Sequence, residues 1–135
     1  MADRTHKSVI RTDAAPAAIG TYSQAVRAGG LVFLSGQIPL VPETMALVSK
    51  DFGQQAQQAV TNLAAVAVAA GGSLDDLVKI NIYLTDLDNF QTVNEVMMRL
   101  FREPFPARAA VGVSALPKGS AIEVEAVMAA PSECD

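Results

Sequence analysis

The segment that most restricts the fold is 51–70, whose apolar residues recur with the spacing of an amphipathic α-helix. Residues three and four positions apart share one side of a helix, so this segment has an apolar and a polar side. Asp51 is a suitable N-cap, and Gly71 and Gly72 form a suitable C-terminal stop. The buried side is expected to hold Phe52, Ala56, Ala59, Val60, Leu63, Val66, Ala67 and Ala70, and the opposite side Gln54, Gln57, Gln58, Thr61 and Asn62.

Segments with the patterns of β-strands lie on both sides of this helix. Residues 24–28 and 31–38 are predicted to form a β-hairpin about a Gly-Gly turn. The predicted order is a strand at 7–12, the hairpin, the helix at 51–70, a strand at 77–85, a second helix at 90–102, and strands at 105–113 and 122–127. This order predicts an α+β fold in which a mixed sheet carries two helices on one face.

The two faces of the predicted strands differ. Residues 31–34 are apolar on both faces, as in a central strand that is buried on both sides. Gly36 interrupts that strand, which indicates a bulge or the close approach of another group to the backbone. The second sheet face is built from Ala, Gly, Val and Tyr with few charges, so we expect another subunit to cover it. In the strand at 77–85, the dry face is expected to hold Val78, Ile80, Ile82 and Leu84.

Length and charge narrow the class of protein. With 135 residues, the chain (1–135) is expected to form a single domain. The net charge of −4 and the absence of a basic stripe argue against nucleic-acid binding. No window reaches the ~18 apolar residues of a membrane span, and no signal core precedes the domain, so a cytoplasmic location is expected. The single cysteine, Cys134, cannot form an intrachain disulfide.

The residue types that are present exclude several kinds of catalytic site. The only histidine is His6, outside the predicted core, which excludes a Ser-His-Asp triad and histidine-based metal sites. Neither a phosphate-binding loop nor a dinucleotide-binding glycine motif is found. Catalysis would therefore use Arg, Glu, Asp, Tyr, Ser, Thr, backbone groups and water. We expect no metal and no cofactor.

Arg108 is the most unusual residue of the predicted strands. Its neighbours on the same face are Ala110 and Gly112, which leave empty volume beside a permanent cation. Such a hollow could take a carboxylate. On the last strand Glu123 and Glu125 share a face and could stand near that hollow. The alternative is structural, with either glutamate neutralising Arg108 and fixing the sheet or a subunit contact.

Two further polar residues lie where the pattern does not explain them. Asn94 falls inside the apolar stripe of the second helix, and a buried amide needs hydrogen-bond partners. It would anchor a neighbouring loop, or alternatively line a site. Tyr22 lies in a predicted loop, 13–22, that contains Pro16 and Gly20, and it is either a packed aromatic residue or a site residue.

Five segments together resemble the RidA/YjgF family. These are 17–25, 34–38, 89–94, 105–108 and 116–126, read as AAIGTYSQA, LSGQI, NFQTVN, FPAR and LPKGSAIEVEA. They occur in the family's order and cover nearly the whole chain. The resemblance implies the chorismate-mutase-like α+β fold, assembled as a homotrimer with clefts between subunits. It also implies a hydrolase that converts reactive enamines and imines, such as 2-iminobutanoate and 2-iminopropanoate, to 2-oxo acids and ammonia without a cofactor.

The resemblance also implies roles for individual residues. Arg108 would hold the substrate carboxylate, and the backbone at Gly36 and Ala110 would complete the cradle. Glu123 would orient or activate water. The side chains that shape the cleft would be Tyr22 and Asn94. Two positions depart from the family pattern, because Ala110 stands where many members have Cys and Thr21 replaces the usual Pro.

Other functions remain open at this point. One is a dedicated deaminase acting on an aminomuconate-like enamine. The others are non-catalytic: binding of 2-oxo acids, a chaperone-like role, or inhibition of translation. The acidic charge counts against RNA contact but not against a chaperone role.

Overall fold

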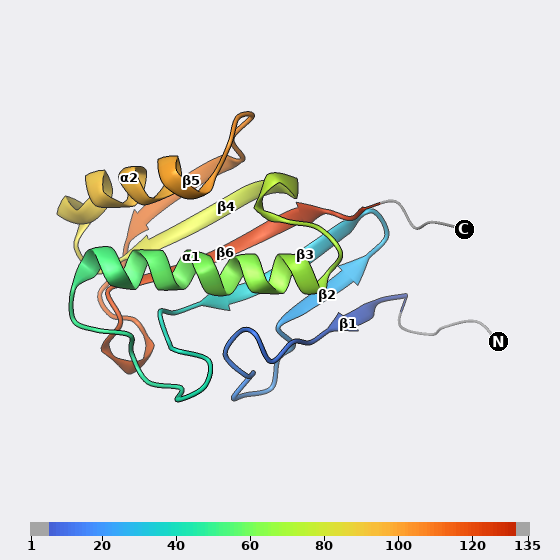
Figure 1. The fold of residues 1–135 in the computed structure, drawn as a ribbon, viewed down its shortest axis with the longest axis horizontal. Coiled ribbons are helices and arrows are strands. Elements are labelled where there is room, and N and C mark those ends of the chain that lie inside the picture. The colour runs from blue at the N-terminus through green and yellow to red at the C-terminus, as the bar shows by residue number, and fades with distance from the viewer. Residues whose placement is uncertain (1–5, 132–135) are drawn as a thin grey trace.

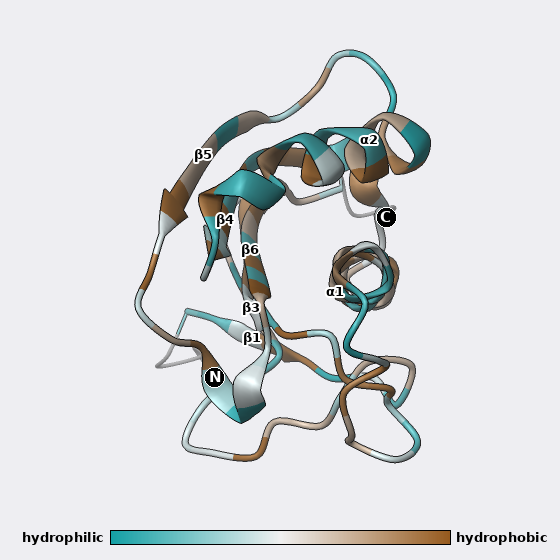
Figure 2. Ribbon diagram, turned by 90° about the vertical axis from the view of Figure 1, so that its left-hand side faces the viewer, coloured by the Kyte–Doolittle hydropathy of each residue, from teal (hydrophilic) through white to brown (hydrophobic). Residues whose placement is uncertain are grey.

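The computed structural model describes residues 6–131, which form a six-stranded mixed sheet covered on one face by two α-helices. Figure 1 shows the helices lying across the sheet, and Figure 2 shows both on the same side of it. This confirms the predicted α+β architecture. The strands are β1 (Ser8–Ile10), β2 (Ala25–Ala28), β3 (Leu31–Gln37), β4 (Leu77–Leu84), β5 (Ala107–Gly112) and β6 (Ile122–Ala129). The α-helices are α1 (Phe52–Ala69) and α2 (Phe90–Leu100), and three short 3₁₀ turns are η1 (Leu74–Asp76), η2 (Leu87–Asn89) and η3 (Pro117–Gly119).

The strand order β1-β2-β3-β6-β4-β5 places the C-terminal strand in the middle of the sheet. Every neighbouring pair is antiparallel except β4 and β5, which are parallel and are connected through α2. A parallel pair needs such a crossover, because a tight turn cannot bring the chain back to the same end. Consequently β5 and β6, although consecutive in the sequence, are separated by β4.

Helix α1 matches the predicted segment closely. The side chain of Asp51 accepts a hydrogen bond from the backbone N–H of Gln54 at 2.9 Å, which makes Asp51 the N-cap. The predicted polar side is wrong at Asn62, whose side chain is only 1% exposed. Its Nδ2 donates to the carbonyl oxygens of Ile38 and Leu40, so this amide fastens the segment after β3 to the helix. The predicted stripe is buried at Ala56, Ala59, Val60, Leu63, Val66 and Ala67.

Strand β3 is buried on one face only. Its side chains Val32 and Leu34 lie in the core, whereas Phe33 is 48% exposed and Leu31 is also exposed. The predicted burial of residues 31–34 on both faces is therefore not found within a single chain. The pairing with β6 shifts between Leu34 and Gln37, which confirms the irregularity predicted at Gly36.

Strand β4 differs from its prediction at one end. The register with β6 shifts between Leu77 and Lys79, so Leu77 is buried while Val78 is 46% exposed. The expected place of Val78 on the dry face is wrong, because a bulge moves the alternation by one position. The other three residues of that face, Ile80, Ile82 and Leu84, are buried as predicted.

We call the sheet face opposite the helices the outer face. The strand pairings align Val26, Phe33, Val127, Lys79 and Ala107 across it, and Tyr83 and Val111 pair on the same face. No helix covers this face in the described chain (Figure 2). Within residues 6–131, no helix has both the length and the apolar character to cross a membrane.

Candidate active site

Arg108 lies on β5 and points toward the helices. It pairs with Ile80 of β4, whose side chain is buried beneath them. Its Nη1 donates a hydrogen bond to Oδ1 of Asn94 at 2.6 Å and lies 3.7 Å from Sδ of Met97. The guanidinium carbon lies 4.9 Å from the centre of the Phe90 ring. All three partners belong to α2, so this helix positions the arginine.

A hollow of about 580 Å³ opens beside this arginine. The predicted empty volume therefore exists, although its walls come mainly from α2 and from the turn before β5 rather than from small neighbours on the strand. Asn94 does not anchor a neighbouring loop, because its side chain accepts from Arg108 and borders the hollow. The lining residues are Asn94, Met97, Met98, Phe105, Pro106 and Arg108.

A second hollow, of about 460 Å³, lies on the outer face around Glu123. Tyr22 borders it from the loop before β2 and is 50% exposed. Gly36 borders it from the irregular part of β3, and a Cβ atom there would overlap the carboxyl group of Glu123. The absence of a side chain at position 36 thus lets the carboxyl group lie against the β3 backbone. The full lining is Ile19, Tyr22, Ser35, Gly36, Ile38, Pro117, Glu123 and Glu125.

The two glutamates of β6 have different electrostatic environments. Burial raises the pKa of Glu123 above its ordinary value, and the charge of Glu125 raises it further. The described residues form no hydrogen bond or ion pair with the carboxyl group of Glu123. Glu125 instead accepts from Tyr83 Oη at 2.6 Å and from Asn81 Nδ2 at 3.2 Å, and its hydrogen bond raises the pKa of Tyr83. Glu123 is thus the carboxyl group left available for chemistry.

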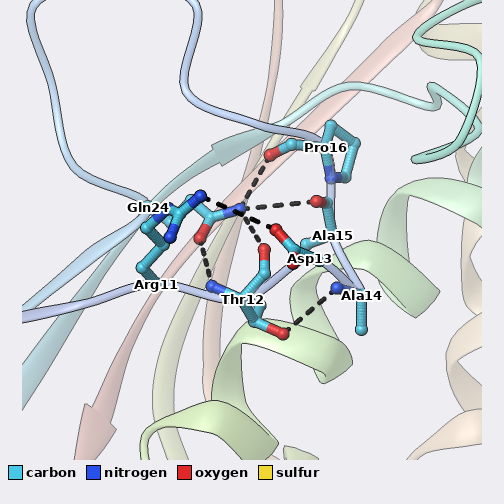
Figure 3. Close-up of polar contacts among 7 residues, drawn as sticks. All are labelled: Arg11, Thr12, Asp13, Ala14, Ala15, Pro16 and Gln24. Carbon is cyan, nitrogen blue, oxygen red and sulfur yellow. Dashed lines mark hydrogen bonds and ion pairs between the residues drawn. The ribbon is translucent and has the colours of Figure 1, made fainter.

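The loop that carries Tyr22 is fastened by a residue that sequence patterns did not single out. Gln24 is buried, its Oε1 accepts from the N–H of Thr12 at 2.7 Å, and its Nε2 donates to the carbonyl of Pro16 at 2.8 Å (Figure 3). Weaker contacts reach Thr12 and Ala15 carbonyls. The sequence feature that could have pointed to Gln24 is a polar residue at the start of a predicted strand, next to apolar residues.

Phe90 was also missed, because it was expected only as part of the apolar stripe of α2. The sequence feature that could have pointed to its role is its spacing of four from Asn94.

The two hollows lie on opposite faces of the sheet. Arg108 and Asn94 lie on the helix side, whereas Glu123, Gly36 and Tyr22 lie at the outer-face hollow. The expected closeness of the acidic pair to the Arg108 hollow is therefore wrong within one chain, and so is an intrachain ion pair between Arg108 and either glutamate. The reason is that β4 separates β5 from β6 and that the side chains point to opposite faces. Ala110 is half-buried, and its side chain borders neither hollow.

The remaining chemistry of the described chain is limited. No group of three His, Cys, Asp or Glu side chains suited to a metal ion occurs in residues 6–131. Cys134 lies outside the described residues.

The fold, a six-stranded mixed sheet with two helices on one face, is that of the RidA/YjgF class of proteins. The crystal structure of RidA from the Antarctic bacterium Psychrobacter sp. is 52% identical and superposes with a TM-score of 0.87, covering 90% of this chain and 98% of that one. TdcF of E. coli, solved with bound serine, is 40% identical with a TM-score of 0.84, covering 90% of this chain and 98% of that one.

The family itself is shown by sequence. The model of the family described as "Endoribonuclease L-PSP" matches residues 12–130, and the chain belongs to this family. A relative from Dermatophagoides farinae, named 2-iminobutanoate/2-iminopropanoate deaminase, is 44% identical over 122 residues, which is 90% of this chain and 95% of the relative.

Proposed function

We propose that this protein hydrolyses reactive 2-imino acids and their enamine tautomers, including 2-iminobutanoate and 2-iminopropanoate, to 2-oxo acids and ammonia. The observation that carries the proposal is the arginine of the helix-side hollow. Nη1 of Arg108 is held by α2, whereas no hydrogen bond from the described residues reaches its Nε or Nη2. That edge is a two-donor fork matching a carboxylate. The name of the Dermatophagoides farinae relative supports the same reaction.

The second half of the proposed site comes from a neighbouring subunit. Arg108, Asn94 and the backbone at Ala110 would act with Tyr22, Gly36 and Glu123 of the adjacent copy. This is supported by the opposite directions in which Arg108 and Glu123 point in one chain. It is also supported by the exposed outer face, where Phe33 and Val111 lack a cover. We therefore propose a homotrimer with the clefts between subunits.

The proposed reaction needs only a positioned water molecule. Arg108 binds the carboxylate of the imino acid, and the backbone at Gly36 and Ala110 borders it. Glu123 accepts a proton from water as the water oxygen bonds to the carbon of the protonated imine, and the π electrons of the C=N bond move to nitrogen. Glu123 returns this proton to the nitrogen of the carbinolamine. The C–N bond then breaks with its electron pair leaving on ammonia, while the C=O bond forms and the hydroxyl proton passes to the Glu123 carboxylate. The products are the 2-oxo acid and ammonia, and no cofactor takes part.

The proposal is tested by replacing the arginine. Arg108→Ala is expected to lower kcat/KM for freshly generated 2-iminobutanoate at least about a hundredfold, because the substrate is no longer held in place. Arg108→Lys should not restore it, because lysine lacks the planar fork. The matched control is Arg102→Ala, an exposed arginine paired with Asp75. Ammonia release that is unchanged in Arg108→Ala, with the assembly intact, would refute the proposal.

The same measurements separate the alternatives. A non-catalytic protein would bind 2-oxobutanoate saturably and release no ammonia. A dedicated aminomuconate-type deaminase would act faster on that enamine than on 2-iminobutanoate. The family description names an endoribonuclease, but the net charge of −4 offers no basic surface for RNA, so we do not propose that activity.

A further inference from the structure

We propose that Phe90 is a positioning residue of the active site, which sets the orientation of the Arg108 guanidinium through the face of its ring. The inference rests on the proposed function, since it concerns how the carboxylate-binding arginine is held. Phe90 does not border the hollow beside Arg108, so it does not contact a molecule bound there. It acts through the arginine.

The strand that carries Arg108 does little to hold its side chain. β5 is one of the two edge strands of the sheet, and the neighbours of Arg108 on the same face are Ala110 and Gly112. Within the described chain Arg108 forms no ion pair, and its side chain is exposed. A free arginine side chain has many rotamers, and ordering them on binding costs free energy. Any preorganisation must therefore come from elsewhere.

Helix α2 supplies it through three residues on one stripe. Phe90, Asn94 and Met97 are four and three positions apart, which places them along the same side of the helix. Asn94 accepts from Nη1 at 2.6 Å, and Met97 Sδ lies 3.7 Å from the same nitrogen. The ring centre of Phe90 lies 4.9 Å from the guanidinium carbon, within the range of a cation–π contact.

The three contacts have different effects on the guanidinium. The amide and the sulfur occupy Nη1, which leaves the Nε and Nη2 edge for a carboxylate. The ring holds the plane of the group, because a guanidinium favours contact with an aromatic face. Phe90 is itself partly buried against the core, so the ring is a fixed support. Together the three contacts orient the guanidinium of Arg108 so that its Nε and Nη2 edge is available to the substrate.

An aromatic ring has an advantage over an acidic partner at this position. A carboxylate beside Arg108 would orient it too, but it would compete with the carboxylate of the substrate for the same donors. The ring and the neutral amide orient the cation without neutralising its charge. The positive charge therefore remains available to the substrate.

The role predicts a change in binding rather than in the chemical step. Phe90→Leu keeps an apolar side chain but removes the aromatic face, and it is expected to raise KM for 2-iminobutanoate about threefold to tenfold, the range of an aromatic–cation contact. kcat should change less than twofold, because the contact contributes equally to binding of the substrate and of the transition state. Phe90→Tyr keeps the ring and should restore KM. The dissociation constant of 2-oxobutanoate, measured by calorimetry, should rise in parallel.

Phe52→Leu is the matched control. Phe52 is also a partly buried phenylalanine packed against the core, at the start of α1, and neither a hydrogen bond nor a ring contact joins it to Arg108 in the described chain. The Phe52→Leu variant should lose a similar amount of stability with KM unchanged.

A second measurement reports on the ring directly. The NMR resonance of the Arg108 Nε–H, identified by its loss in Arg108→Lys, should move away from its ring-shifted position in Phe90→Leu and not in Phe52→Leu.

The outcomes separate this inference from the proposed function. If the parent protein releases ammonia and depends on Arg108, but Phe90→Leu keeps the parent KM, the inference alone is overturned. It is also overturned if Phe90→Tyr behaves as Phe90→Leu, because the ring is then not the cause. If the parent releases no ammonia, the function fails, and the calorimetric comparison still tests Phe90. If the parent neither turns over nor binds 2-oxobutanoate, both are overturned.

Discussion

The position of the Glu123 carboxyl group depends on the absence of a side chain at residue 36. A Cβ atom there would overlap the carboxyl group of Glu123, while the pairing of β3 with β6 is irregular at the same place. We therefore expect Gly36→Ala to displace the carboxyl group of Glu123 and to lower ammonia release. The loss of folding free energy should be small, because the displaced atoms are the end of a flexible side chain. Thermal unfolding and ammonia release, measured on the same samples, check both expectations.

Gly30→Ala is the control for this substitution. Gly30 lies in the turn between β2 and β3, and an added Cβ there would meet no atom within 4 Å. It should change neither the melting temperature nor the activity appreciably. Equal losses in the two variants would show that the overlap with Glu123 is not the cause.

Glu123 gives the activity a predictable pH dependence. As the proposed general base, Glu123 would act as a carboxylate, so activity is expected to fall as the pH drops through its raised pKa. Part of that rise comes from the charge of Glu125. Glu125→Gln removes the charge and should lower the pKa of Glu123, which moves the acid limb of the kcat/KM profile to lower pH. An acid limb that stays at the same pH, or moves to higher pH, in Glu125→Gln would contradict the assignment of Glu123 as the general base.

At the scale of the elements, α1 does more than cover the sheet. Asn62 fastens the carbonyls of Ile38 and Leu40 to the helix, and these residues follow directly after the strand that contains Gly36. Asn62→Leu leaves both carbonyls without that donor and is expected to cost about 1–3 kcal/mol of folding free energy. Urea unfolding measures it, with the neighbouring exposed Thr61→Ala as a control near zero.

The elements were largely predictable from sequence because their signals are local. The N-cap at Asp51, the glycine turn after β2 and the alternation in β4 depend on neighbouring residues only. The errors came from non-local pairing. Val78 is exposed because of a register shift against β6, and Asn62 is buried because of the segment that crosses the helix at that point.

The candidate site was likewise predictable where the signals are local and unpredictable where they depend on non-local pairing. Arg108, the pair Glu123 and Glu125, and the strand interruption at Gly36 could be singled out from residue types and neighbours, whereas the choice of Glu123 over Glu125 came from the family resemblance. The distribution of these residues over two faces could not be predicted, because it depends on β6 inserting between β3 and β4. The contact between Phe90 and Arg108 was hidden for a similar reason. The spacing of four places Phe90 on the same helix stripe as Asn94, but it does not show that the arginine of β5 lies over the ring.

At the scale of the whole molecule, the proposed assembly gives a test that no single variant provides. Arg108→Ala and Glu123→Gln should each be inactive alone. When equal amounts are unfolded and refolded together, about a quarter of the shared clefts should combine an intact arginine with an intact glutamate, if subunits assort randomly in a closed ring. Ammonia release near that fraction of the parent value is expected. Persistent inactivity of a mixed assembly would contradict a site shared between chains.

In the proposed assembly, the placement of Arg108 and Glu123 on opposite faces predicts an activity that depends on protein concentration. A single chain carries both groups but does not present them to the same substrate molecule. Specific activity should then follow mass action, constant at high protein concentration and vanishing as subunits dissociate. On this proposal a lone copy has no activity, and the protein concentration in the cell sets a threshold below which no turnover is expected.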